Sequence, residues 1–193
     1  MQRETKALLI LAGGKGARFG GDKGLFEFEG TAMIRRVLDA LRPLADSVVV
    51  AVAPGKSPDY SRLLGSSAVI VEDIKAHKGP LLGLRDALAH VSGDILILSA
   101  CDMPFIRADL YRLLLGRLGG KEAAMPIVRG YNEPIMGVYR LPALRKAIDI
   151  ATSSGAVKLS AILPHLDYLG ITEEEMVVAG LDTAMLTNLN RPP

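Results

Sequence analysis

Residues 8–23 read LLILAGGKGARFGGDK, an apolar run that passes directly into a loop with five glycines, one arginine and two lysines. A short apolar run bounded by glycine is typical of a buried strand. Glycine has no Cβ and tolerates positive φ, so the loop can direct several backbone N–H groups toward one point. With cationic side chains around it, such a loop suits a polyphosphate group. The sequence therefore predicts a first strand followed by a nucleoside triphosphate site.

Two common phosphate-binding patterns fit this loop poorly. The P-loop needs Gly-Lys followed by Ser or Thr, whereas Lys23 is followed by Gly24, so the hydroxyl that would contact Mg²⁺ is missing. The dinucleotide fingerprint needs Gly-x-Gly-x-x-Gly, but Phe19 stands where the third glycine belongs. The loop is therefore a phosphate loop of another kind, or a flexible connection between two elements.

The composition indicates one ordinary α/β domain covering residues 1–193. The chain is 49% hydrophobic and 23% charged, which is enough for a core and argues against disorder. The net charge of +2 and an aromatic content of 5% argue against nucleic-acid binding. The sequence has no stretch of 18 apolar residues, no secretory leader in residues 1–6 and a single cysteine. We expect a cytoplasmic protein that does not bind membranes.

Strand-like and helix-like segments alternate through the first half of the chain. Apolar runs predict strands at 7–12, 47–53, 68–72 and 94–100. Helices are expected at 31–42, 59–65 and 80–91, the first of them with Thr31 as its N-cap and Pro43 beyond its end. Such β-α repeats imply a mainly parallel sheet with right-handed crossovers.

The second half of the chain is less regular. Residues 107–118 have the pattern of a helix, and residues 141–151 and 156–164 that of shorter helices. Strands are expected at 123–128 and 133–140, the latter antiparallel to its neighbours. The predicted fold is a single-domain, three-layer, Rossmann-like sheet that is mainly parallel with one antiparallel strand.

Ligands of open parallel sheets lie beyond the carboxyl ends of the strands, and polar residues follow several of the predicted strands here. Asp102 ends the strand at 94–100; a carboxylate at the end of a buried strand is costly unless a cation pairs with it, and Mg²⁺ bound to a triphosphate would suit it. Asp73 follows the strand at 68–72. Either aspartate could instead be an ordinary turn residue, and Asp102 a helix N-cap.

A third feature is the sequence Gly79-Pro80-Leu81-Leu82-Gly83, which opens the helix expected at 80–91. Pro80 fits the first helical turn. Gly79 and Gly83 would allow the backbone to approach a ligand closely. The same residues are also compatible with a simple helix start and one packed glycine.

The motifs of this chain resemble those of a known enzyme family. Residues 11–23 resemble the signature loop of nucleotidyltransferases with a single Rossmann-like domain, and the early Gly-Gly with the final Asp-Lys resembles the molybdenum cofactor guanylyltransferases, the MobA family. Cys101-Asp102-Met103-Pro104 is similar to the motif whose aspartate binds the metal in that family. Residues 79–84 are similar to the segment that lines its nucleotide pocket, and the resemblance extends over nearly the whole chain.

The resemblance implies a set of site residues. The catalytic residues would be Arg18, Lys23 and Asp102, with Asp102 also holding Mg²⁺. The nucleotide would lie against Leu11, Ala12, Gly13, Gly14, Gly16, Lys23, Asp73, Gly79, Pro80 and Asp102. The acceptor would contact Gly83, Asn188 and Asn190. For Asp73, the chemistry leaves open whether the carboxylate accepts from the guanine N–H groups or from the ribose hydroxyls.

The C-terminal segment departs from the family pattern, because Arg191 stands where the family's Asn-x-Asn-Thr-Pro motif has threonine. Residues 132–139 and 154–160 resemble parts of the family's second-substrate pocket, but they also suit an edge strand and a loop that leads into a helix. Cys101 has no evident base beside it, so we interpret it as a packing residue.

The implied activity is transfer of GMP from GTP to the phosphate of molybdopterin or its molybdenum form, with release of pyrophosphate. The resemblance also allows contacts with other proteins of cofactor biosynthesis. One alternative keeps the fold and changes the substrate, as in a cytidylyltransferase for the same pterin or a transferase for a sugar or polyol phosphate. Another alternative is a regulatory module that binds a nucleotide without turnover, although binding alone would not need the metal carboxylate.

Overall fold

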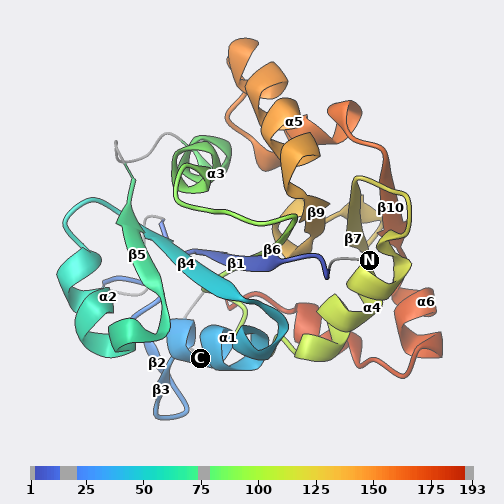
Figure 1. Ribbon diagram of the computed structural model, residues 1–193. Coiled ribbons are helices and arrows are strands. Elements are labelled where there is room, and N and C mark those ends of the chain that lie inside the picture. Colours follow the sequence, from blue (N-terminus) through green and yellow to red (C-terminus); the bar gives the residue numbers. More distant parts are fainter. Residues whose placement is uncertain (1–2, 14–20, 74–78, 190–193) are drawn as a thin grey trace.

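The computed structural model describes residues 3–13, 21–73 and 79–189 (Figure 1). Its main sheet has the strand order β10-β7-β9-β6-β1-β4-β5, and a further strand, β8, pairs with β7. The strands are β1 (Lys6–Leu11), β4 (Ser47–Val52), β5 (Val69–Glu72), β6 (Ile95–Ala100), β7 (Ala123–Val128), β8 (Tyr131–Asn132), β9 (Val138–Arg140) and β10 (Tyr168–Ile171). The four strands predicted in the first half of the chain are all present.

The strand directions confirm a mainly parallel sheet with an antiparallel strand. β1 is parallel to both β4 and β6, and β4 is parallel to β5. β9 is antiparallel to both of its neighbours, β6 and β7, while β10 is parallel to β7. The carboxyl ends of β1, β4, β5, β6, β7 and β10 therefore all lie along one edge of the sheet, where polar loops are expected to meet.

Helices cover both faces of the sheet and make three layers (Figure 1). One face carries α3 (Pro80–Leu88) and α5 (Leu141–Ser153), and the other carries α1 (Met33–Leu41), α2 (Ser57–Leu64), α4 (Ala108–Leu118) and α6 (Glu173–Val178). The alternation of side chains along β1 serves both layers, because Leu8 and Ile10 join the core under α1 and α4 whereas Leu9 joins the core under α3. Strands buried on both faces explain the uninterrupted apolar runs.

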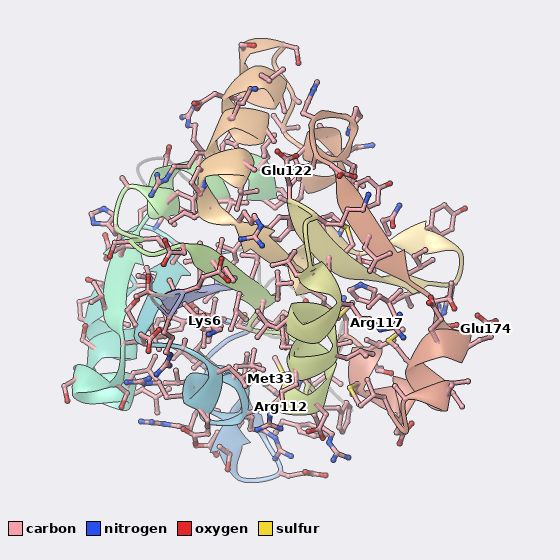
Figure 2. All side chains as sticks on the ribbon, turned by 45° about the vertical axis from the view of Figure 1, so that its right-hand side comes forward. Lys6, Met33, Arg112, Arg117, Glu122 and Glu174 are labelled. Atoms are coloured by element: carbon pink, nitrogen blue, oxygen red, sulfur yellow. The ribbon has the colours of Figure 1, made fainter. Side chains whose placement is uncertain are left out.

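The outer faces of the helices carry the charges. Arg112 and Arg117 on α4 and Glu174 on α6 are exposed, and Figure 2 shows them among the polar side chains that surround the ribbon. Among the described residues, no helix combines the length and the apolar character needed to cross a membrane.

One local expectation is wrong, and another is met by a helix of a different type. Thr31 is not an N-cap; it pairs with Phe28 in the hairpin of β2 (Glu27–Phe28) and β3 (Thr31–Ala32), and α1 begins two residues later without a side-chain cap. The short helix expected at 156–164 is present as a 3-10 helix, Leu159–His165, which contains Pro164. Pro43 does lie just beyond α1, in a 3-10 turn.

The region 133–140 is strand only over Val138–Arg140, because Pro134–Met136 forms a 3-10 turn. Further strands and one further helix were not expected from the sequence: the β2–β3 hairpin, β8, β10 and α6. β10 contains Gly170, and a Cβ at that position would lie 2.7 Å from Ile127 Cδ1. The glycine that obscures this strand in the sequence is therefore the residue that lets it pack against β7.

Candidate active site

Backbone hydrogen bonds align the loops that follow β1, β5 and β6. Ala12 N donates to Ala51 O at 2.7 Å, Asp73 N to Val52 O at 2.9 Å and Cys101 N to Leu11 O at 3.0 Å. These bonds continue the sheet pairing for one residue past the strand ends. The predicted phosphate loop, Asp73 and Asp102 consequently leave the sheet at the same edge.

Lys23 and Asp102 meet at this edge although 79 residues separate them. Lys23 Nζ donates to Asp102 Oδ2 at 2.7 Å, and the two side chains are 20% and 21% exposed. A carboxylate and an ammonium group are thus held side by side in a partly shielded place that solvent still reaches. Lys23, in the Asp-Lys pair that ends the first motif, thus lies against the aspartate of the second motif.

Asp73 has different surroundings. A Cβ at Gly13 would lie 2.9 Å from Asp73 Oδ2, and one at Gly83 would lie 3.3 Å from Asp73 Oδ1. The carboxylate therefore rests between the backbone after β1 and the first turns of α3, against two residues that must be small. Burial raises the pKa of the Asp73 carboxyl, and the carboxylate of Asp86 raises it further.

The start of α3 explains the glycine before Pro80. Gly79 has a φ of +98°, and a Cβ there would lie 2.8 Å from Val157 O. Pro80 occupies the first helical turn as expected. The group that approaches Gly79 closely in this structure is the backbone of residue 157, which also accepts a hydrogen bond from Leu81 N at 3.3 Å. The segment 154–160, singled out in the sequence, therefore lies next to the start of α3.

Asn188 lines a hollow of about 700 Å³ beyond the ends of β7 and β10. Glu133, Met136 and Thr187 also line it, and burial raises the pKa of the Glu133 carboxyl. The next residue, Leu189, donates its backbone N–H to Asp102 O at 2.9 Å. This hollow and the Lys23–Asp102 pair are therefore joined by one short segment of backbone.

Several predicted site residues cannot be placed in this way, because Gly14, Gly16, Arg18 and Asn190 lie outside the described residues. Leu11, Ala12 and Gly13 lie at the end of β1, as expected, although their contacts with a nucleotide stay a prediction. Cys101 is buried, and burial together with the Asp102 carboxylate raises the pKa of its thiol, which fits a packing residue.

Sequence reasoning missed a contact to the loop that carries Lys23, here called the lysine loop. Tyr60 on α2 is fully buried, and its hydroxyl donates to Asp22 Oδ1 at 2.7 Å. Asp22 directly precedes Lys23 in the first motif, so the sequence indicated that it lies near the site. The partner on α2 could not be found from spacing, because a tyrosine in an amphipathic helix is usually only a core residue.

The fold and this sheet edge define a Rossmann-like α/β domain of the nucleotidyltransferase type. An Archaeoglobus fulgidus structure named "Molybdopterin-guanine dinucleotide biosynthesis protein A" superposes with a TM-score of 0.75, covers 96% of this chain and 93% of that chain, and is 24% identical. A 2-C-methyl-D-erythritol 4-phosphate cytidylyltransferase from Thermus thermophilus superposes with a TM-score of 0.71 over 98% of this chain and 94% of that chain, at 18% identity. At these identities the likeness shows the fold.

The sequence comparisons are more specific. A family model described as the MobA-like NTP transferase domain matches residues 8–168, and the chain belongs to this family of nucleotidyltransferases. A Pelotomaculum thermopropionicum protein named "Probable molybdenum cofactor guanylyltransferase" is 31% identical over 95% of this chain and 87% of its own length. A "Molybdenum cofactor guanylyltransferase" from Desulfosudis oleivorans is 28% identical over 94% of this chain and 88% of its own length. The family predicted from residues 11–23 and 101–104 is confirmed.

Proposed function

We propose that the protein transfers GMP from GTP to the phosphate of molybdopterin or its molybdenum form. The names of the relatives support this choice of substrates. The observation that carries the proposal is the Lys23 Nζ–Asp102 Oδ2 contact of 2.7 Å, because it joins the glycine-rich loop to the strand-end aspartate of the second motif. A binding module without turnover would not need the metal carboxylate that Asp102 offers.

The reaction is an in-line displacement at the α-phosphorus. An oxygen of the acceptor phosphate forms the new P–O bond, the bond between the α-phosphorus and the bridging oxygen breaks, and pyrophosphate leaves with that oxygen. Negative charge grows on the α-phosphate and on the leaving group. Lys23 would neutralise this charge, with the backbone N–H groups of the loop beneath the phosphates and with Arg18 as the second cation.

Asp102 suits the Mg²⁺ ion that this chemistry needs. Mg²⁺ takes one or two carboxylates and completes its shell with water and substrate phosphate oxygens. Asp102 offers such a carboxylate, which is 21% exposed and already faces a cation, Lys23. When bound there, the ion would supply charge neutralisation on the triphosphate. Asp102 would hold it, and Lys23 would then turn from the carboxylate to the phosphates.

The nucleoside would lie on the side of Asp73. The two small residues Gly13 and Gly83 let the backbone of two elements approach the carboxylate closely. Such a group can accept from guanine N1–H and N2–H₂ together, or from the two ribose hydroxyls. The acceptor would occupy the hollow beside Asn188, which the segment ending in Leu189 joins to Asp102.

A nucleotide panel tests the proposed function. Purified protein is incubated with Mg²⁺, molybdopterin and GTP, CTP or ATP, and pyrophosphate release and the dinucleotide product are measured. We expect turnover with GTP and a much lower rate with the other two. Turnover with CTP but not with GTP would refute the guanylyltransferase and favour a cytidylyltransferase for the same pterin. Nucleotide binding without pyrophosphate release under all these conditions would favour the regulatory module.

A further inference from the structure

Asp22 holds the lysine loop in a fixed turn. Its Oδ1 atom accepts from Gly24 N at 3.0 Å, so the side chain of residue 22 reaches around Lys23 to the backbone that follows it. The same oxygen accepts from the Tyr60 hydroxyl at 2.7 Å. Lys23 therefore lies between Asp22 and Gly24, which are joined by a hydrogen bond across it. The same carboxylate oxygen of Asp22 is hydrogen-bonded to Tyr60 on α2.

Tyr60 is built to act as a permanent donor. Its side chain is 0% exposed, and burial, aided by the bond to Asp22, raises the pKa of its hydroxyl far above the physiological range. A buried phenol stabilises the fold only when its hydroxyl finds a partner. Here that partner belongs to the loop of a predicted catalytic lysine, 38 residues earlier in the chain.

Gly24 shows how closely the phenol is fitted to this loop. A Cβ at residue 24 would lie 2.2 Å from Tyr60 Oη and 3.1 Å from its Cζ. On its other side, Gly24 O accepts from Ile34 N at 2.9 Å, in the first turn of α1. The backbone after Lys23 is therefore held between α1 and the ring of Tyr60, with no room for a side chain.

α2 is itself anchored to the nucleotide side of the site. Ser57 N, in the first turn of α2, donates to Glu72 Oε1 at 2.9 Å. This bond is the largest cause that lowers the pKa of the Glu72 carboxyl, and Gly55 N adds to it. Glu72 directly precedes Asp73. One helix therefore connects the end of β5 with the loop that carries Lys23.

We propose that Tyr60 is a positioning residue for catalysis: through Asp22 it fixes the turn that aims Lys23 Nζ at Asp102 and at the phosphates. Tyr60 touches neither substrate nor metal in this role. The expected effect on the rate rests on the proposed function, whereas the effect on the position of Lys23 does not depend on it. A misplacement of about 1 Å in a catalytic group can cost on the order of a hundredfold in rate.

The substitution Tyr60→Phe tests this role, because it removes the hydroxyl and keeps the ring. We expect kcat with GTP to fall about tenfold to a hundredfold while KM for GTP changes less than about twofold. In a Lys23→Ala background the same substitution should have almost no further effect on kcat, since the group that it positions is gone. Equal effects in both backgrounds would overturn the proposal.

Tyr111→Phe is the matched control. Tyr111 is equally buried, and its hydroxyl donates to Leu98 O at 2.8 Å in the core beneath α4. Both variants lose one buried hydrogen bond and should lose similar thermal stability, so a kinetic effect confined to Tyr60→Phe cannot arise from stability alone. An equal fall in kcat for both variants would contradict a specific role of Tyr60.

A crystal structure of the Tyr60→Phe variant separates this proposal from the proposed function. If Tyr60 positions the loop, residues 22–24 move and the Lys23 Nζ–Asp102 Oδ2 distance exceeds the limit of about 4 Å for an ion pair. An unchanged 2.7 Å contact would overturn the positioning role whatever reaction the enzyme catalyses. Absence of GTP turnover in the wild-type protein would instead refute the proposed function and leave the structural result to decide on Tyr60.

Discussion

Asp102 and Asp73 end two strands at the same sheet edge, yet their surroundings are opposite. Asp102 meets the ammonium group of Lys23 at 2.7 Å, so its negative charge is compensated. Asp73 lies against the backbone at Gly13 and Gly83, and burial raises the pKa of its carboxyl. Under the proposed function, this contrast implies a division of labour: the β6 end of the site would handle charge, and the β5 end would recognise an uncharged group by hydrogen bonds.

The largest effect is expected at the charged end. Asp102→Ala should lower kcat/KM for GTP by about a thousandfold or more, because it removes the proposed Mg²⁺ ligand. The fold should survive, since the hydrogen bond from Leu189 uses the backbone oxygen of residue 102. Pyrophosphate release measures the rate, and circular dichroism the fold. Asp109→Ala, which removes an exposed carboxylate on α4, is the control; wild-type activity in Asp102→Ala would refute the metal assignment.

Lys23→Ala should have the next largest effect. We expect kcat to fall by about a hundredfold to a thousandfold, as for other groups that stabilise transition-state charge, with a smaller change in KM. Steady-state kinetics over a range of GTP concentrations separates the two constants. Lys121→Ala is the matched control, because Lys121 also pairs with an aspartate at 2.7 Å, but on the exposed surface beside Asp167. If Lys23→Ala raises KM and leaves kcat unchanged, the lysine contributes to ground-state binding of GTP rather than to catalysis.

The recognition end can be disturbed by one methyl group. Gly13→Ala places a Cβ 2.9 Å from Asp73 Oδ2, so the carboxylate must shift. We expect KM for GTP to rise about tenfold, the loss expected when a hydrogen bond to a charged group is weakened. In Gly116→Ala, on α4, the new methyl group meets nothing within 4 Å, so KM should stay unchanged. Equal KM values for both variants would argue against Asp73 as a nucleoside contact.

The smallest effect concerns stability and its pH dependence. Because the pKa of Asp73 is raised in the folded chain, ionisation of this carboxyl costs stability above that pKa, and the cost disappears as the pH falls through it. Asp73→Asn should therefore raise the Tm by about 1–2 °C at pH 7, and the difference should shrink as the pH is lowered. Thermal melts at a series of pH values from neutral down to the ordinary aspartate pKa of 3.8 measure it.

Asp94→Asn supplies the opposite sign. Thr5 donates to Asp94 Oδ2 from its backbone N and its hydroxyl, both at 2.8 Å, and these bonds lower the pKa of the carboxyl. Its ionised form therefore stabilises the fold above the ordinary pKa, and this contribution is lost as the pH falls. A Tm that rises in Asp94→Asn, or falls in Asp73→Asn, would contradict this account.

Most of the sheet could be predicted because its strands are buried on both faces. The apolar runs ending near Leu11, Val52 and Ala100 have the short length and the lack of polar alternation that are typical of such strands. The rule that parallel strands bring their carboxyl ends to one edge predicts that the polar residues after these strands gather there, whereas the direct Lys23–Asp102 contact is visible only in the structure. The β2–β3 hairpin escaped because each strand has two residues. α6 is short and rich in glutamate and valine, although the capping box of Thr172 and Glu175 was a usable signal.

The contacts of single side chains could not be predicted in the same way. Nothing in the spacing of Tyr60 distinguishes a tyrosine that packs in a core from one that binds Asp22. The cradle of Asp73 depends on Gly13 and Gly83 approaching it from two elements, which only the packed structure reveals. These contacts depend on how α2 and α3 pack against the sheet. That packing is determined jointly by all the side chains that interdigitate there.

In the part of the chain that the structure describes, the main sheet ends at β5 on one side and at β10 on the other, and each of these strands has four residues. The unpaired backbone groups of an edge strand can pair with a strand of another molecule and so start aggregation. Short edge strands limit this risk. The strands with long apolar runs, β1, β4 and β6, all lie inside the sheet. Substitutions that destabilise β5 or β10 should therefore increase aggregation at high protein concentration before they reduce the rate of turnover.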